Sequence, residues 1–184
     1  MEKIILNKKN GSKIEGKLKF LDISYIDKIM KLQEQVYNEL EKKEFYFCSS
    51  KEEFIDIFNG KGRIVGCVTS DDELIAIGSY AEFGYDKSNY GYDVNIKGDE
   101  LLKVGQLEAT IVSSDYRGNR LQKKMCEMLE EIALVNKMKY ICVTAAPDNI
   151  YSVNTIKNLG YKTILEKLKY GGLKRYVFMK KTEV

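Results

Sequence analysis

Apolar and polar positions follow two different periods along the chain, which indicates a protein of mixed helices and strands. Apolar residues spaced three and four apart predict one helix over residues 22–40. A second helix is predicted after residue 50, because Ser50 and Glu53 form the pattern of a capping box. The polar, glycine-containing stretch 59–62 ends it.

Runs of β-branched and apolar residues predict the strands. Residues 1–20 are expected to form a hairpin around Asn10-Gly11, a strong signal for a tight turn. Further strands are predicted at residues 64–69, 74–81, 107–113, 140–145, 161–168 and 175–179. A helix at 149–158, capped by Gly160 in a left-handed conformation, precedes the last two.

The most informative change of period lies between residues 107 and 135. A strand is followed by a polar turn that holds Gly118, and then by a predicted helix with one apolar face. The N-terminus of such a helix presents unpaired N–H groups and the positive end of the helix dipole. Arg117 and Arg120 add positive charge beside it, so the turn is a predicted phosphate site.

Two common phosphate loops do not fit this turn. A Walker loop ends in Gly-Lys-Ser or Gly-Lys-Thr, whereas Gly118 is followed by Asn119-Arg120-Leu121. A dinucleotide fingerprint requires three spaced glycines, and this turn has one.

The frame Val112-Ser-Ser-Asp-Tyr-Arg-Gly-Asn-Arg-Leu-Gln122 instead resembles a motif of the GNAT family of N-acetyltransferases, Val-x-Pro-x-Tyr-Arg-Gly-x-Gly-x-Gly/Ala. Ser114 stands in place of the proline, and Arg120 and Gln122 in place of the last two motif positions. A second block, Ala146-Pro-Asp-Asn-Ile-Tyr-Ser152 followed by Leu159-Gly-Tyr161, resembles the family's Pro-x-Asn-x-x-Ala/Ser and Gly-Phe. The resemblance covers roughly residues 62–181.

This resemblance implies an α+β fold. Its mixed, mostly antiparallel central sheet is expected to be splayed between its fourth and fifth strands, with helices on both faces. Those strands correspond to Leu107–Ser113 and Tyr140–Ala145. We expect one acyl-CoA-binding acetyltransferase domain over residues 1–184.

The resemblance also implies acetyl-CoA as cosubstrate. Arg117 is expected beside the pyrophosphate, which the backbone N–H groups would hold at Gly118, Asn119, Arg120, Leu121 and Gln122. The side chain of Arg120 either contacts a phosphate or points outward. The groups expected to meet the pantetheine are the backbone of Ile111, Val112 and Ser113 and the side chains of Asn149 and Ser152.

Glu108 is the predicted general base. It is a carboxylate in an otherwise apolar strand, and burial raises the pKa of such a group toward a useful value. Strand alternation predicts that Thr110 and Val112 share its face. The alternatives are an outward or salt-bridged Glu108, and Glu82 as the base.

The general acid is less defined. The family often places a tyrosine seven residues after the asparagine of the second block, where this chain has Ile156. Tyr170, before Gly171-Gly172, is the predicted replacement, with Tyr151 as a further candidate.

Composition narrows the chemistry. The chain has no histidine, which excludes Ser-His and Cys-His nucleophiles and histidine-based zinc sites. Its four cysteines lie far apart and are expected to be reduced, so no metal site is predicted. Direct attack of an amine is therefore favoured over a covalent enzyme intermediate.

Charge and hydropathy bear on location and partners. The net charge of +3 arises largely near the C-terminus, without a nucleic-acid-binding motif, so no nucleic-acid partner is expected. No apolar run approaches the ~20 residues of a membrane span, and no secretion signal is evident. We expect a cytoplasmic protein without a membrane partner, either a monomer or a homodimer.

The polar segment Phe83–Val104 contains three tyrosines and is long for a loop. It is predicted to be either an acceptor-binding lid or an extension without a role. The leading hypothesis is an N-acetyltransferase that acts on a primary amine of a small molecule or peptide, in a ternary complex with acetyl-CoA. The alternative is a CoA-binding regulatory module of the same fold without catalysis.

Overall fold

Eight strands form one mixed sheet in the computed structural model, which describes residues 2–183. The outer ends of the predicted domain, Met1 and Val184, lie outside the described residues. The strands are arranged in the order β1-β2-β3-β4-β5-β6-β8-β7. Their bounds are β1 Glu2–Asn7, β2 Lys13–Phe20, β3 Gly62–Thr69, β4 Leu74–Ala81, β5 Val104–Val112, β6 Tyr140–Ala145, β7 Lys162–Lys169 and β8 Leu173–Lys181.

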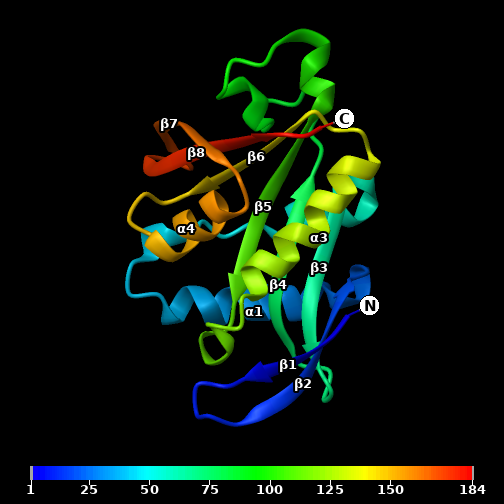
Figure 1. Ribbon diagram of the computed structural model, residues 1–184, viewed down its shortest axis with the longest axis vertical. Helices are drawn as coiled ribbons and strands as arrows, with labels where there is room; N and C mark the ends of the chain where they lie inside the picture. Colours follow the sequence, from blue (N-terminus) through cyan, green and yellow to red (C-terminus); the bar gives the residue numbers. More distant parts are fainter. Residues whose placement is uncertain (1, 184) are drawn as a thin grey trace.

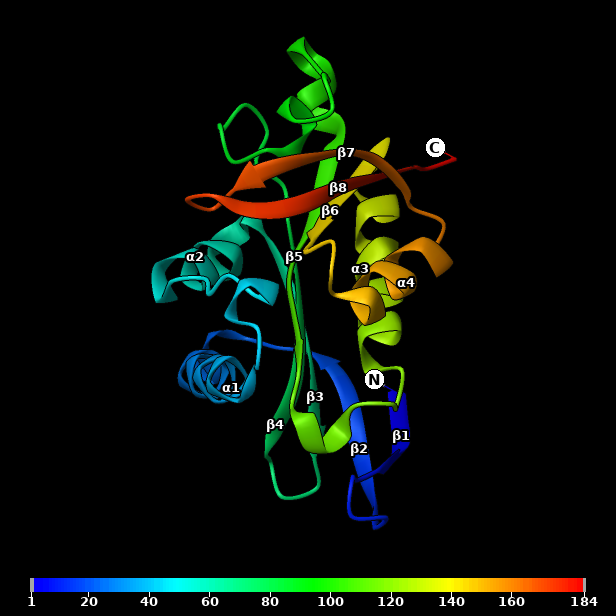
Figure 2. The same cartoon turned by 90° about the vertical axis from the view of Figure 1, so that its left-hand side faces the viewer.

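Within residues 2–183, four α-helices cover the sheet, two on each face (Figure 1, Figure 2). Helices α1 (Ile26–Glu39) and α2 (Lys51–Asp56) lie on one face, called here the α1/α2 face; α3 (Leu121–Val135) and α4 (Ile150–Asn158) lie on the other, the α3/α4 face. The capping box of Ser50 and Glu53 begins α2 as predicted. The α+β class is confirmed. Within residues 2–183, no helix is long and apolar enough to cross a bilayer.

The sheet opens between β5 and β6. This is the parallel pair of the sheet, and its pairing runs only from Val104–Tyr140 to Leu107–Val143. Beyond Leu107 the strands separate, which Figure 2 shows as a gap between their ribbons. These are the strands predicted to splay; they are fifth and sixth along this chain because the hairpin β1–β2 precedes α1.

A β-bulge in β5 lies at the point of separation. Leu107 pairs with Tyr80 and Thr110 with Gly78, so Glu108 and Ala109 together oppose the single Ser79. The bulge reverses the order of faces along the strand. Glu108 faces the α1/α2 side. Thr110 instead contacts Cys126 of α3, and Val112 packs against the core of the same α3/α4 face. The expectation that Thr110 and Val112 share the face of Glu108 was therefore wrong.

Each face of the sheet has its own hydrophobic core. Met125, Leu129 and Ala133 of α3 are fully buried against one face, as the predicted apolar stripe required. Ile29 and Phe54, from α1 and α2, are equally buried against the other. Burying a side chain of this size contributes about 1.5–3 kcal/mol, so the two cores hold the sheet rigid around the opening.

The segment between β4 and β5 is ordered by its own contacts. It forms short 3₁₀ turns at Tyr90–Tyr92 and Gly98–Lys103, and Tyr90 packs with Val104 and Cys142 in a third apolar cluster. The side-chain amide of Asn89 donates to two carbonyls of the segment, at 2.7 and 3.0 Å. The segment is therefore a shaped part of the fold.

Candidate active site

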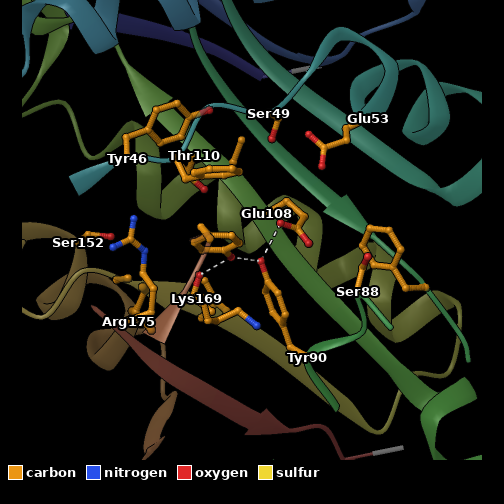
Figure 3. Close-up of a pocket in the computed structure, with 18 of the residues that line it drawn as sticks. Tyr46, Ser49, Glu53, Ser88, Tyr90, Glu108, Thr110, Ser152, Lys169 and Arg175 are labelled. Carbon is orange, nitrogen blue, oxygen red and sulfur yellow. Dashed lines mark hydrogen bonds between the residues drawn. The ribbon is translucent and has the colours of Figure 1, made fainter. Parts of the chain in front are cut away.

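A pocket of about 620 Å³ lies where β5 and β6 separate. This volume is typical of a site for a small molecule or cofactor. On the α3/α4 face it is lined by Gln122, Cys126, Asn149, Ser152 and Ile156. On the α1/α2 face it is lined by residues of α2, of the segment between β4 and β5 and of the β7–β8 turn (Figure 3). The pocket thus passes through the sheet and joins its two faces.

Glu108, the predicted general base, lies in this pocket. Burial raises the pKa of its carboxyl to about 7, although hydrogen bonds from the Gln106 amide and the Tyr90 hydroxyl lower it in part. Nearby Glu53 adds to the rise. A carboxyl with a pKa near 7 exchanges protons readily at neutral pH, which suits a general base.

Tyr170 reaches the same place from the β7–β8 turn. Its hydroxyl lies 2.5 Å from that of Tyr90 and 3.2 Å from Oγ1 of Thr144. Tyr90 in turn donates to Glu108 at 2.9 Å. Since each hydroxyl has one proton to donate, Tyr170 donates to Tyr90, and Thr144 can donate to Tyr170. The four side chains therefore form one chain of hydrogen bonds that ends at Glu108.

The turn that carries Tyr170 has an unusual backbone. Tyr170 itself adopts a positive φ of 52°, followed by Gly171 and Gly172 at 78° and 112°. A non-glycine residue in this region costs roughly 1–2 kcal/mol. The ring of Phe47 stacks on Tyr170, with centroids 4.8 Å apart and planes at 12°, and helps to hold it. Burial raises the pKa of Tyr170, as does the charge of Glu108, so its hydroxyl stays protonated at neutral pH.

Tyr90 offers a direct test of this chain of hydrogen bonds. Its bond to Glu108 favours the ionised carboxylate, so Tyr90→Phe should raise the pKa of Glu108 further. We expect the rising limb of the pH–rate profile to move to higher pH. Tyr92→Phe is the matched control, because the Tyr92 hydroxyl donates to a carbonyl of its own loop. Identical profiles for both variants would contradict the assigned role of Tyr90.

The residues predicted to meet a pantetheine lie on the opposite side of the opening. Asn149 caps α4 by accepting from the N–H of Ser152 at 3.3 Å, and Gln122 donates to the Ser152 hydroxyl at 3.0 Å. All three line the pocket. They join α3 to α4 at the mouth of the opening.

Fewer backbone groups of β5 are free to meet a ligand than predicted. The N–H of Ser113 donates to Ile75 of the β4 side, and its carbonyl accepts from Tyr116. Because successive residues alternate between the two neighbours of a strand, Ile111 is also directed toward β4. The groups that face the opening are therefore those of Thr110 and Val112. Val112 remains a candidate backbone contact; Ile111 and Ser113 do not present an open edge.

The glycine turn lies at the surface, before α3 and outside the pocket. Gly118 has φ 85°, and a side chain added there would meet nothing within 4 Å. Arg120, at φ 57°, occupies a left-handed position that favours glycine, which explains the glycine in the motif that it departs from. Arg117 and Arg120 are exposed, while the side chain of Leu121 is buried in the core.

Asn119 has a structural task in addition. Its amide pairs with the backbone of Asn7 through two hydrogen bonds of 2.8 Å, and the N–H of Lys9 donates to Asp115. The hairpin β1–β2 thus braces the glycine turn. The side chain of Asn119 is occupied by these contacts, so its part in binding would be through its backbone N–H.

Two sequence candidates lie elsewhere, and the position of the family's tyrosine holds a residue that cannot act as an acid. Glu82 accepts from Tyr80 and Asn136 and does not line the pocket. Tyr151 is 81% exposed on α4, away from the pocket. Ile156 lines the pocket at the position where the motif would place a tyrosine, but it has no proton to donate.

Three residues in or beside the pocket had no predicted role. Gln106 is 1% exposed; its amide donates to Glu108, and its carbonyl oxygen accepts from the N–H of Tyr90 at 2.8 Å. Thr144 and Arg175 line the pocket itself. Gln106 could have been identified from the sequence, because it is a polar residue two positions before Glu108 in an otherwise apolar strand. Nothing in the local sequence marked the other two, because the fold brings them from distant strands.

A comparison of the sequence with models of known protein families gives a match. A family model described as the acetyltransferase (GNAT) family matches residues 26–161. No curated protein matches the chain in sequence.

Solved structures resemble the chain at low sequence identity. An acetyltransferase of the GNAT family from Streptococcus pneumoniae has a TM-score of 0.68 at 12% identity, covering 91% of this chain and 99% of that one. The ribosomal-protein-alanine N-acetyltransferase of Brucella melitensis has 0.67 at 13%, covering 90% and 99%. The Salmonella typhimurium protein yncA, solved with its cofactor acetyl-CoA, has 0.68 at 10%, covering 90% and 93%. At these identities the likeness concerns the fold.

Proposed function

Because the chain belongs to the GNAT family of acetyltransferases, we propose that it transfers an acetyl group from acetyl-CoA to a primary amine in a ternary complex. One observation carries this proposal most: the pocket passes through the sheet between β5 and β6, with Glu108 inside it. A cosubstrate held on the α3/α4 face and an acceptor entering from the α1/α2 face would meet at this carboxylate.

The residues present fit such a cosubstrate. The exposed turn at Gly118 leaves free space in front of the N-terminus of α3, where anions are favoured. The open edge at Thr110 and Val112 offers backbone groups to an extended, amide-containing chain. When bound, acetyl-CoA supplies an activated acetyl group as a thioester.

Glu108 would prepare the acceptor. An amine is mostly an ammonium ion at neutral pH, so it must lose a proton before its nitrogen can attack a carbonyl carbon. The carboxylate of Glu108 would accept that proton, directly or through the hydroxyl of Tyr90. As the new amide forms, the thiolate leaves, and either Tyr170 or water supplies the proton that makes it a thiol.

Cys126 is the cysteine that lines the pocket, and its properties support direct transfer. Burial raises the pKa of its thiol to about 12, and the charge of Glu130 adds to the rise. A thiol that stays protonated at neutral pH is a poor nucleophile. An acetyl-cysteine intermediate at this position is therefore disfavoured.

The acid contributes less than the base. A thiol of ordinary pKa, about 8.5, yields a tolerable leaving group near neutral pH. We expect Tyr170→Phe to lower kcat by about tenfold, within the ~100-fold that general-acid help can supply. Tyr151→Phe, on the exposed face of α4, is the control and should leave kcat unchanged. If Tyr151→Phe lowered kcat more than Tyr170→Phe, the assignment of Tyr170 would be wrong.

Release of free thiol from acetyl-CoA, measured over a panel of primary amines and peptides, tests the proposed function. We expect amine-dependent release above the rate of hydrolysis without an acceptor. A protein whose melting temperature rises with CoA, but which releases no thiol with any amine, would instead be a CoA-binding regulatory module.

A further inference from the structure

Arg175 is a buried cation that lines the pocket. It lies near the start of β8 and is only 3% exposed, the least of the charged residues that line the pocket. Figure 3 shows its guanidinium directed into the pocket, away from its own strand. A charge removed from water in this way costs stability unless it is paired.

Within residues 2–183, no ion pair to Arg175 is found. One hydrogen bond is present, from Nη1 to the neighbouring carbonyl of Lys174 at 2.8 Å, and Cζ lies 5.5 Å from the ring centroid of Tyr170. A guanidinium has five N–H donors, so most of its capacity is unused. The exposed Glu44 acts on it only at a distance, and burial lowers the pKa of Arg175.

Lys169, another cation of the same pocket, differs in this respect. Its ammonium forms an ion pair with Asp93, which also pairs with Lys167 at 2.6 Å. The Nζ atom of Lys169 also lies 4.3 Å from the ring centroid of Tyr90. Lys169 therefore has a counter-ion within the protein, which it shares with Lys167, whereas the charge of Arg175 has none among the described residues and is left for something that enters the pocket.

The orientation of β8 places Arg175 on the acceptor side. Tyr176 and Phe178 pack in the core of the α3/α4 face, so Arg175 points to the α1/α2 face by strand alternation. Tyr170 lies between the two charged groups: its ring faces Arg175, and its hydroxyl leads through Tyr90 to Glu108. One side of this short path is cationic, and the other accepts a proton.

We propose that the acceptor is a small amine that also bears a carboxylate, which Arg175 binds while the amine lies at Glu108. Guanidinium and carboxylate match in shape and form two parallel hydrogen bonds. This proposal rests on the proposed function and specifies its substrate class. Arg175 is then a specificity-determining residue, and the charged carboxylate fixes which end of the acceptor meets the base.

Matched acceptors test the proposal. α-Amino acids and ω-amino acids of two to six carbons are each compared with their primary amides, with acetyl-CoA saturating. The amide of an α-amino acid has the less basic amine, with a pKa near 8, so basicity favours the amide and cannot produce a preference for the acid. We expect at least one acid to exceed its amide in kcat/KM by about 10- to 100-fold, mainly through KM.

Arg175→Gln should abolish this preference and leave the KM for acetyl-CoA unchanged. Arg175→Lys should keep part of it, because the charge remains without the planar fork. Lys174→Gln is the control, since it removes an exposed neighbouring charge. Melting temperatures of the variants, with and without CoA, show whether each is folded.

The outcomes separate this proposal from the proposed function. Turnover of amines without a preference for the acid, or a preference that persists in Arg175→Gln, overturns the role of Arg175 alone. If no amine turns over, the proposed function fails. Calorimetric titration of the same acids and amides into the CoA-saturated protein then decides: Arg175-dependent binding of acids supports the site, and its absence overturns it.

Discussion

Glu108→Gln is expected to lower kcat about 100- to 1,000-fold while leaving the affinity for CoA unchanged. The substitution keeps the size of the side chain and one of its two acceptor oxygens, but an amide cannot accept a proton from the acceptor's ammonium. The loss should therefore exceed that of Tyr170→Phe. Steady-state rates at saturating acetyl-CoA and acceptor measure it. A loss below tenfold would exclude Glu108 as the base.

The pH dependence of the same reaction follows from the pKa of about 7 at Glu108. The deprotonated form is active, so the rate should rise with pH through about 7 and then reach a plateau. The raised pKa of Tyr170 keeps its hydroxyl protonated, so no falling alkaline limb is expected up to about pH 10. A bell-shaped profile whose alkaline limb disappears in one tyrosine variant would contradict this account and identify that tyrosine as an essential acid.

As pH rises, the stability of the protein should fall while its activity rises. Burial raises the pKa of Glu108 from 4.5 to about 7, so the native protein holds this proton where the unfolded chain has lost it. The free energy of unfolding therefore falls as pH rises from about 4.5 to 7, by at most about 3 kcal/mol. Glu108→Gln removes that cost. We expect it to melt higher than the parent at pH 8 and equally at pH 4.

Gly118→Val should remove most of the stabilisation that CoA gives. At a CoA concentration of 100 times the dissociation constant, binding to the native state contributes about 2.7 kcal/mol, or roughly 5–10 °C in melting temperature. A branched side chain would fill the open space in front of α3, and φ 85° is a conformation that valine avoids. Thermal melts with and without CoA measure the effect.

Gly11→Val is a close control for this substitution. Gly11 has φ 86°, and a side chain there would also meet nothing within 4 Å, so the backbone strain is matched. Both variants should melt lower than the parent without CoA. Only Gly118→Val should lose the shift. If Gly118→Val keeps the full shift, the phosphates bind elsewhere.

Much of the fold could be predicted because local patterns carried it. The hairpin turn at Asn10-Gly11, the capping box of α2 and the apolar stripe of α3 depend on residues close in sequence. The bulge at Glu108 could not be predicted in the same way. It arises from pairing with Ser79, about thirty residues earlier, and one extra residue reverses every face beyond it.

The site was predictable in part for the same reason. Glu108 is marked by its apolar neighbours, and Tyr170 by the glycines that follow it. The partners that complete the site come from other elements: Tyr90 from the segment before β5, and Arg175 from β8. Arg175 looked like one of many C-terminal basic residues. Its burial without an ion pair to any described residue distinguishes it from them, and that feature exists only in the folded chain.

The central claim is that this protein moves an acetyl group directly to an amine with Glu108 as base, and a single turnover tests it most directly. Protein in excess over acetyl-CoA is mixed with an acceptor found in the amine panel, and mass spectrometry follows the acetyl group over time. We expect acetyl to appear on the amine without passing through the protein, and to appear about 100- to 1,000-fold more slowly in Glu108→Gln. Acetyl-protein that forms first and then decays, or an unchanged rate in Glu108→Gln, would contradict the account.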